Sequence, residues 1–310
     1  MIQKRVPLVV PTIKTDFLVF CKNIDIFKKF LPISHIYVVG DEELKGVVPI
    51  GDFFIFVNEK DLLPINHLKQ LFASRCMNLP KGQHGCGWYI QQFIKMIFAT
   101  VCEEEYYLLW DSDTVPVKEI QVFDKDGVPF LDTKTEFFKS YFDTIGNLFP
   151  GLGKDYPRSF ISEHMLIKSS IMKSLLNDIT SNDRLVGDTP FEKIINTINI
   201  VDLQKAGFSE FETFGTYVYS KFREEYRFRV WTSMRFGACF FNKGDFLEQD
   251  ILDWLAVNYY AISFEKGDEE STFFSSIVKI KLFRRYFSSS ILEFFSLIIR
   301  GTRFIKRRLL

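Results

Sequence analysis

The chain has 310 residues, of which 47% are hydrophobic and 25% are charged, and its formal net charge is zero. A chain of this length and composition can bury a full core, which excludes disorder for most of it. From Lys279 onward, nine basic residues accompany one acid, Glu293, so this segment carries +8 and leaves −8 on the rest. Basic charge confined to one segment argues against a nucleic-acid binder and favours a local anionic partner such as a lipid surface.

The cysteines and the first residues indicate the compartment. The five cysteines are odd in number and irregularly spaced, and the first residues lack the long apolar stretch of a secretory leader. Both features predict a reducing cytoplasm. Cys76, His84 and Cys86 are close in sequence, but no second ligand pair follows at a matching interval, so a zinc site is disfavoured.

Three short apolar runs open the sequence, at residues 6–10, 35–39 and 52–57. Each ends in polar or Pro-containing turn residues and is predicted to be a buried strand. Residues 16–31 carry apolar side chains at helical spacing before Pro32, so a helix is predicted between the first two strands. This order of strand, helix and strand predicts an α/β fold with a parallel sheet.

The remaining pattern predicts one continuous domain, residues 1–278, with a C-terminal appendage, residues 279–310. Further helices are predicted over residues 64–78, 88–102, 135–148, 162–178 and 190–206, with a flexible Gly-rich joint over 81–87 and a hairpin over 117–133. Within the appendage, residues 286–299 are apolar but too short to span a bilayer. They are predicted to form an interfacial amphipathic helix, with a core helix as the alternative.

Residues 106–110, Tyr-Tyr-Leu-Leu-Trp, are another predicted strand, and this run ends at Asp111-Ser112-Asp113. Open α/β sheets bind ligands beyond the carboxyl ends of their strands. Two carboxylates one residue apart supply hard oxygen ligands for Mg²⁺ or Mn²⁺, which can stabilise a departing diphosphate. The chain holds a second Asp-x-Asp, Asp124 to Asp126, but this one precedes Gly127 and is predicted to be a solvated turn.

With this motif, residues 6–116 resemble the GT-A fold nucleotide-sugar glycosyltransferases, in which an apolar strand delivers Asp-x-Asp to the donor site. Residues 87–95 (Gly-Trp-Tyr-Ile-Gln-Gln-Phe-Ile-Lys), 162–165 (Ser-Glu-His-Met) and 208–215 (Phe-Ser-Glu-Phe-Glu-Thr-Phe-Gly) look like a bacterial group of polysaccharide-biosynthesis transferases described mostly as a domain of unknown function. The resemblance implies a GT-A-like domain with a central, mostly parallel Rossmann-like sheet flanked by helices.

The same resemblance implies a function. A sugar is moved from a nucleotide-diphosphate donor to a glycan or lipid-linked acceptor, in a capsule, O-antigen or similar surface-glycan pathway. The basic segment, residues 279–310, fits peripheral contact with an anionic membrane at the inner face of the cell membrane.

The resemblance also implies residues on the donor side. Gln91, Gln92 and Lys95 are expected to line the nucleotide sugar, since Gln91 and Lys95 share one helix face; a solvated helix face is the alternative. The residues that follow the first strand, where such folds seat base and ribose, include Thr12, Lys14 and Asp16. Asp16 either accepts from a ribose hydroxyl or, like Thr15, caps the next helix.

Two later segments are candidates for contact with the acceptor or the diphosphate. Glu163 and His164 fit this role, although Ser162 as a helix N-cap with Glu163 in the first turn is an alternative. Another set of cationic and aromatic residues suits phosphate oxygens and a sugar face, unless they are ordinary surface strand residues: Arg229, Trp231 and Arg235.

Glu210 and Glu212 are candidate catalytic carboxylates. In an extended segment they point the same way, and for an inverting transferase Glu210 is the predicted general base. The alternative is that both are capping acids of a helix that runs through Tyr217.

Two other functions use similar residues. A metal-dependent nucleotidyltransferase or phosphatase also needs clustered carboxylates beside a strand, but no Gly-rich basic phosphate loop follows the first strand. A non-catalytic, membrane-peripheral scaffold is the second alternative. The concentration of acids, His and Gln at predicted element ends argues against it.

Overall fold

The computed structural model of this chain describes residues 4–77, 82, 84–242, 248–265 and 270–309. The chain divides into two compact units, each assembled from segments distant in the sequence. Unit 1 combines Met1–Ile13, Ile33–Asp111 and Val122–Val230, and unit 2 combines Lys14–Pro32, Ser112–Gln121 and Trp231–Leu310. This interleaving does not test the predicted domain boundary at residue 278, which stays a prediction.

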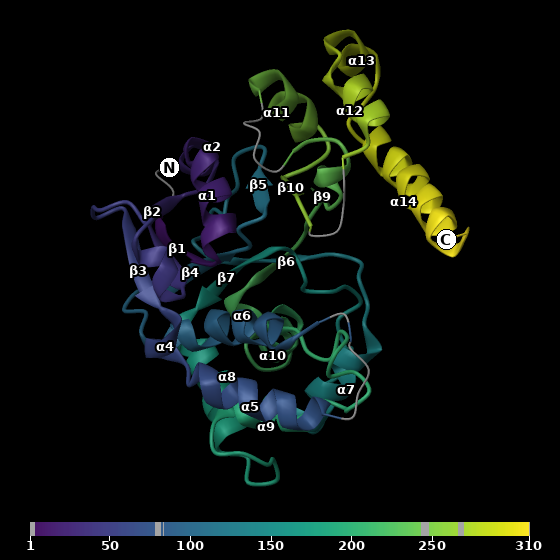
Figure 1. The fold of residues 1–310 in the computed structure, drawn as a ribbon. Helices are drawn as coiled ribbons and strands as arrows, with labels where there is room; N and C mark the ends of the chain where they lie inside the picture. The colour runs from purple at the N-terminus through teal and green to yellow at the C-terminus, as the bar shows by residue number, and fades with distance from the viewer. Residues whose placement is uncertain (1–3, 78–81, 83, 243–247, 266–269, 310) are drawn as a thin grey trace. The chain divides into compact units, whose positions relative to one another are not determined.

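Unit 1 is built around a five-stranded sheet with the strand order β3-β2-β1-β4-β7. The strands are β1 (Val6–Pro11), β2 (Ile33–Gly40), β3 (Phe54–Asn58), β4 (Tyr106–Trp110) and β7 (His164–Lys168). All neighbours pair in parallel except β4 and β7. Every residue of β1 and β4 is buried, as in strands covered on both faces. The predicted α/β fold, with a central, mostly parallel sheet flanked by helices, is confirmed (Figure 1).

The helices of unit 1 supply the other half of its core. They are α3 (Glu42–Lys45), α4 (Glu59–Leu62), α5 (Ile65–Cys76), α6 (Cys86–Ile97), α7 (Lys139–Leu148), α8 (Ser169–Thr180), α9 (Pro190–Thr197) and α10 (Glu210–Lys221), with 3-10 turns η1 (Phe98–Thr100) and η2 (Arg223–Glu225). Tyr89, Phe93 and Met96 of α6 are buried in one cluster with Leu109 of β4 and Ile194 of α9. The core therefore fixes α6 against the sheet.

Most predicted elements of unit 1 are present with shifted ends. The strands predicted at 6–10, 35–39, 52–57 and 106–110 are β1 to β4, and the helices predicted from residues 64, 88, 135 and 190 are α5, α6, α7 and α9. The last of these stops at Thr197 rather than 206. Lys81 and Gln83 of the predicted flexible joint lie outside the described residues.

The helix predicted over 162–178 is wrong for its first seven residues. Residues 164–168 form β7, which pairs with the whole of β4, and α8 begins only at Ser169. Met165, Leu166 and Ile167 of this edge strand are all buried. A short apolar run does not distinguish a buried strand from a helix segment, so only the pairing with β4 decides.

Two other predicted elements differ from the structure. The hairpin predicted over 117–133 is limited to residues 122–130, where Phe123 and Pro129 form an antiparallel bridge, because β6 (Phe130–Thr133) pairs in parallel with β8 (Arg227–Val230). Its predicted turn is present, with Asp124 Oδ1 accepting from the backbone N–H groups of Asp126 and Val128. The helix over 16–31 is interrupted at Asn23, whose side-chain amide donates to Val19 O and competes with the helical pattern.

Unit 2 has its own small sheet and core. Its elements are α1 (Lys14–Lys22), α2 (Ile24–Phe30), β5 (Thr114–Pro116), β9 (Ser233–Met234), η3 (Gly237–Cys239), α11 (Gln249–Ala256), β10 (Ala261–Ser263), α12 (Thr272–Lys279), α13 (Lys281–Tyr286) and α14 (Ile291–Leu309). The strand β10 pairs with β5 and β9. Its core joins Ile26, Val115, Trp254, Ile262 and Leu292.

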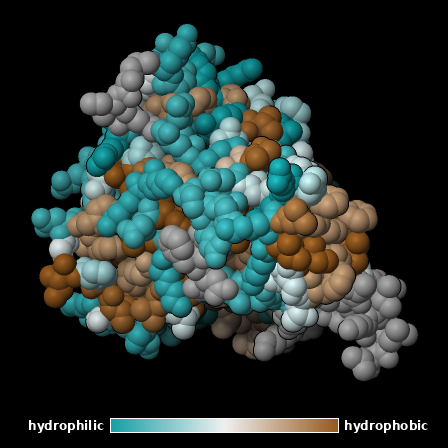
Figure 2. All heavy atoms as spheres, turned by 90° about the horizontal axis from the view of Figure 1, so that it is seen from above, coloured by the Kyte–Doolittle hydropathy of each residue, from teal (hydrophilic) through white to brown (hydrophobic). Residues whose placement is uncertain are grey.

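Large apolar side chains also reach the surface of unit 2, where brown atoms gather beside the grey ones at the right of Figure 2. Within the described residues, no helix combines the length and apolarity that crossing a membrane requires.

Two helical glycines of unit 1 allow a matched test of packing. A Cβ on Gly215 of α10 would lie 2.1 Å from the ring of Phe160, whereas one on Gly146 of α7 would meet its nearest neighbour at 3.5 Å. We expect Gly215→Ala to destabilise the protein by about 1–3 kcal/mol through overpacking. Gly146→Ala should instead stabilise it by about 0.5–1 kcal/mol, because Ala favours helix. Urea unfolding measures both, and equal effects would contradict the packing described here.

Candidate active site

The carboxyl end of β4 is where buried apolar structure gives way to charge. Trp110 is fully buried, and Asp111 directly after it has a side chain that is 28% exposed. The Asp111 backbone N–H donates to Glu163 O at 3.0 Å, which continues the β4–β7 pairing for one more residue. The predicted placement of Asp111 at the end of a buried strand is therefore confirmed.

Lys95 connects this strand end to two helices. It lies on the buried face of α6 and is 4% exposed. Its Nζ is 2.7 Å from Asp111 Oδ1 and 2.7 Å from Glu210 Oε1, and it lies 4.3 Å from the ring centre of Phe211. Burial opposes the ammonium charge, but the two carboxylates outweigh it and raise the pKa of Lys95 above its usual value. The lysine is therefore charged and shared between two acids.

The neighbouring glutamines of α6 are also engaged. Gln92 is buried, and its Oε1 accepts from the backbone N–H of Glu210 at 3.1 Å. The Gln91 side chain donates to the carbonyl of Pro11, the last residue of β1, at 3.5 Å. The alternative of a solvated helix face is thus wrong for Gln92 and Lys95, while contact with a nucleotide stays a prediction.

Glu210 and Glu212 occupy the first turn of α10. Ser209 is the N-cap, and its hydroxyl accepts from Glu212 N at 3.2 Å, so the capping alternative is correct and the extended one is wrong. The two carboxylates have different partners, because Glu212 accepts from the Ser159 hydroxyl at 2.6 Å. Burial raises the pKa of Glu212. A general-base role for Glu210 or Glu212 stays a prediction.

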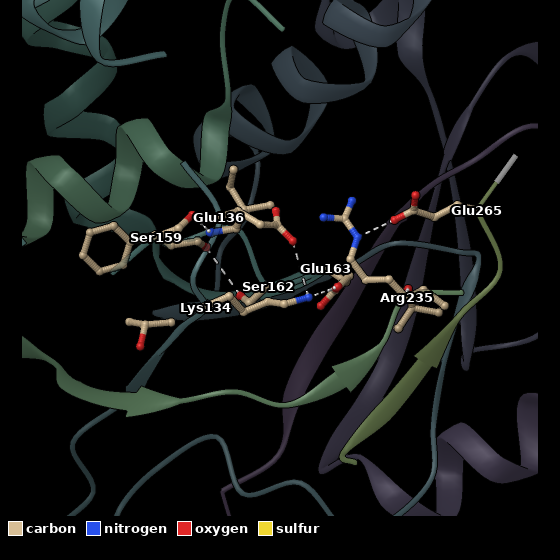
Figure 3. Close-up of polar contacts among 12 residues, drawn as sticks. Lys134, Glu136, Ser159, Ser162, Glu163, Arg235 and Glu265 are labelled. Atoms are coloured by element: carbon tan, nitrogen blue, oxygen red, sulfur yellow. Dashed lines mark hydrogen bonds and ion pairs between the residues drawn. The ribbon is translucent and has the colours of Figure 1, made fainter. Parts of the chain in front are cut away.

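Glu163 has an unusual backbone. Its φ of +59° is the only positive value at a non-glycine residue in the part of the chain that the structure describes. Such a conformation costs about 1–3 kcal/mol and persists where its surroundings enforce it. Here the Glu163 carbonyl accepts a hydrogen bond from the Asp111 N–H. The Glu163 carboxylate pairs with Lys134 Nζ at 2.5 Å, and Glu136 lies 3.8 Å from the same lysine nitrogen (Figure 3). Ser162 does not cap a helix.

His164 and Arg229 meet at a buried acid that the sequence argument did not single out, Asp132. His164 Nε2 lies 2.9 Å from Asp132 Oδ2, and Arg229 donates to both carboxylate oxygens at 2.6 and 2.7 Å. Burial alone would raise the pKa of Asp132, but these partners lower it. A polar residue inside the apolar strand β6 was the available signal, since a buried acid requires a cationic partner.

The other predicted residues of unit 2 have separate surroundings. Asp113 lies in a turn, and its carbonyl accepts from Phe264 N at 2.8 Å. Arg235 Nε pairs with Glu265 at 2.5 Å, an acid that sequence reasoning also missed (Figure 3). Trp231 is buried and stacks on Tyr260 at a ring distance of 4.9 Å.

The segment after β1 is partly in each unit. Thr12 follows β1 in unit 1, and its N–H donates to Val39 O of β2 at 2.9 Å. α1 begins at Lys14 in unit 2, so Asp16 lies in the first turn and does not cap the helix. Contacts of Thr12, Lys14 and Asp16 with a nucleotide stay predictions.

The division between the units falls between Asp111 and Ser112. In the described residues, no group of three or more His, Cys, Asp or Glu side chains is arranged to hold a metal ion.

A sequence model of the "Family of unknown function (DUF6492)" matches residues 19–130, which is less than half of the chain. No curated protein sequence matches. Similar solved structures include mouse xyloside xylosyltransferase 1 in its apo form, with 10% identity over 86% of this chain and 99% of that one and a TM-score of 0.40.

Two others are the galactosyltransferase LgtC, in complex with donor and acceptor sugar analogs, and the bifunctional glycosyltransferase WbbM. LgtC has 12% identity over 85% of this chain and 88% of its own, with a TM-score of 0.39. WbbM has 12% identity over 86% of this chain and 46% of its own, with a TM-score of 0.39. Likeness at this level carries no information about substrate.

Lys95 and Lys193 are both buried lysines of unit 1, and comparing them tests the role of the ion pairs. Lys193 donates to the backbone carbonyls of Thr180 and Asn182 instead of to carboxylates. Lys95→Met leaves two acids without their cation and should cost about 3–5 kcal/mol in urea unfolding. Lys193→Met should cost no more than about 2 kcal/mol.

Adding Glu210→Gln to Lys95→Met removes one of the uncompensated acids and should restore part of the lost stability. If the two single lysine variants lose the same stability, or the added change restores nothing, Lys95 does not hold the strand end through its ion pairs.

Proposed function

We propose that this protein is a metal-dependent glycosyltransferase that moves a sugar from a nucleotide-diphosphate donor. The observation that supports it best is the end of β4, where Asp111 is fixed by a buried lysine and followed two residues later by Asp113. Ligands of such sheets bind beyond the carboxyl ends of the strands, so this edge is where a donor belongs.

The residues present fit a hard divalent cation. Asp111 and Asp113 are both partly exposed and offer carboxylate oxygens, the ligands that Mg²⁺ and Mn²⁺ prefer. Lys95, Asp111 and Glu210 together carry one net negative charge, so the strand end keeps its attraction for a cation despite the lysine. When bound, the cation would neutralise charge on the diphosphate as the glycosyl bond breaks.

The donor nucleotide is assigned to the same edge of the sheet. β1 and β4 are neighbouring parallel strands, so Thr12 after β1 and Asp111 after β4 follow the same edge. The Gln91 amide reaches the end of β1 through Pro11. We assign Thr12 and Gln91 to the base and ribose side, with Asp16 as a ribose acceptor and Lys14 beside it.

The acceptor is proposed to be a glycan or a lipid-linked glycan of a bacterial surface polysaccharide. Glu163, His164, Arg229, Trp231 and Arg235 remain the candidates for contact with it or with the diphosphate. In an inverting transferase a carboxylate takes the proton of the attacking acceptor hydroxyl, and Glu210 remains the first candidate for this base. Because Glu210 shares Lys95 with Asp111, the Glu210 carboxylate also contributes to the net negative charge at the end of β4.

Thermal stabilisation by ligands tests the donor site. We expect one nucleoside diphosphate, from a panel assayed with Mn²⁺, to raise the unfolding midpoint of the wild type, because it binds only the folded state. The shift should disappear with a chelator and in the Asp111→Asn and Asp113→Asn variants.

The second Asp-x-Asp of the chain is the matched control. Asp124→Asn with Asp126→Asn keeps the turn acceptors and removes the same two charges elsewhere, so its metal-dependent shift should equal that of the wild type. A shift that survives in the Asp111 and Asp113 variants, or one that needs no metal, would move the donor site away from the end of β4.

A further inference from the structure

The surface formed by α12, α13 and α14 is rich in exposed apolar side chains. We name it the α12–α14 surface. Its large apolar residues are between 38% and 73% exposed and are Phe273, Ile280, Leu282, Tyr286, Phe287, Phe294, Leu297 and Ile298. Figure 2 shows apolar atoms gathered on this side of the molecule. Single exposed apolar residues are ordinary, but a cluster of them marks a binding surface.

These exposed side chains lie on a different helix face from the residues that build the core. In α14, Leu292 and Ile299 are buried in the core of unit 2 and share one helix face. Phe294 and Leu297 occupy another face and are 60% and 66% exposed. The core-helix alternative is therefore correct for one face of α14, while the interfacial role of its exposed face stays a prediction.

Basic residues accompany the exposed apolar ones. The Lys281 side chain is 81% exposed, and Arg285 and Arg300 are also exposed. Glu293 is the one acid from residue 279 onward, and it accepts from the Tyr259 hydroxyl at 3.3 Å. Arg284 differs from the other cations in being buried, and it donates to Asp250 at 2.5 Å and to Val278 O. The exposed Lys281 lies 3.8 Å from the same Asp250 carboxylate. The basic segment thus has one structural arginine among surface cations.

We infer that the α12–α14 surface docks on an anionic phospholipid bilayer. Apolar side chains such as Phe294 and Leu297 enter the boundary between headgroups and acyl chains, while Lys281 and Arg285 contact lipid phosphates. Charge complementarity selects this occupant over a second copy of the chain, since two such surfaces would bring like charges together. The inference is independent of the proposed catalytic activity.

The apolar contribution is tested by co-sedimentation of the full chain with vesicles of phosphatidylglycerol and phosphatidylcholine. The wild type should bind these vesicles and not pure phosphatidylcholine. Phe294→Ser with Leu297→Ser should weaken binding at least about tenfold, because two apolar side chains that would insert into the bilayer are lost. The control, Ile50→Ser with Val186→Ser, removes two apolar side chains of unit 1 that are even more exposed, and this variant should bind like the wild type.

The charge contribution needs its own pair of variants. Lys281→Glu with Arg285→Glu should also weaken binding at least about tenfold, given about fivefold per basic residue near an anionic membrane. Lys125→Glu with Lys173→Glu reverses two exposed charges of unit 1 and should leave binding unchanged. Raising the salt concentration should weaken binding of the wild type.

The inference is overturned if the wild type does not bind anionic vesicles, or if the double variants of unit 1 lower binding as much as those of the α12–α14 surface. It is also overturned if sedimentation without lipid finds a dimer that the Phe294 and Leu297 variant converts to a monomer, which would assign the surface to self-association. Because no turnover is measured, failure here leaves the donor-site proposal standing. Unfolding midpoints confirm that each variant is folded.

Discussion

The carboxyl end of β4 in unit 1 depends on one buried cation shared by two acids. Lys95 reaches Asp111 at the end of β4 and Glu210 at the start of α10, each at 2.7 Å. A buried ammonium or carboxylate without a partner is costly, so these three groups fix the strand end and both helices relative to one another. Because two negative charges share one positive charge, the arrangement positions Asp111 without cancelling its charge.

Much of the fold of unit 1 could be predicted from the sequence, because local pattern decided it. β1 to β4 are short apolar runs that end in polar residues, and α5 and α9 have helical spacing with clear ends. β7 and β6 were not predictable in this way. Residues 164–168 become a strand by pairing with β4, and residues 130–133 by pairing with β8, partners roughly 55 and 100 positions away.

The same limit applies to the site. The placement of Asp111 was predictable because a strand delivers it directly, whereas Lys95 was singled out by the resemblance and its ion pairs with Asp111 and Glu210 were not predicted. The partners that give these residues their surroundings are distant in sequence: Asp132 joins His164 to Arg229, and Lys134 pairs with Glu163. Glu163 has a positive φ, and its carbonyl accepts a hydrogen bond from the Asp111 N–H. The local sequence around Glu163 does not predict this contact with a residue 52 positions away.

The most direct test of this account is the Mn²⁺ affinity of Glu210→Gln, measured by calorimetry with the preferred nucleoside diphosphate, with Glu212→Gln as the control. Glu210→Gln keeps an acceptor for Lys95 but leaves no net charge at the end of β4, where we propose that the metal binds, so the affinity should fall at least about fivefold. Glu212 pairs with Ser159 instead, and its variant should bind Mn²⁺ like the wild type. Equal affinities in all three proteins, or no Mn²⁺ binding by the wild type, would contradict the account.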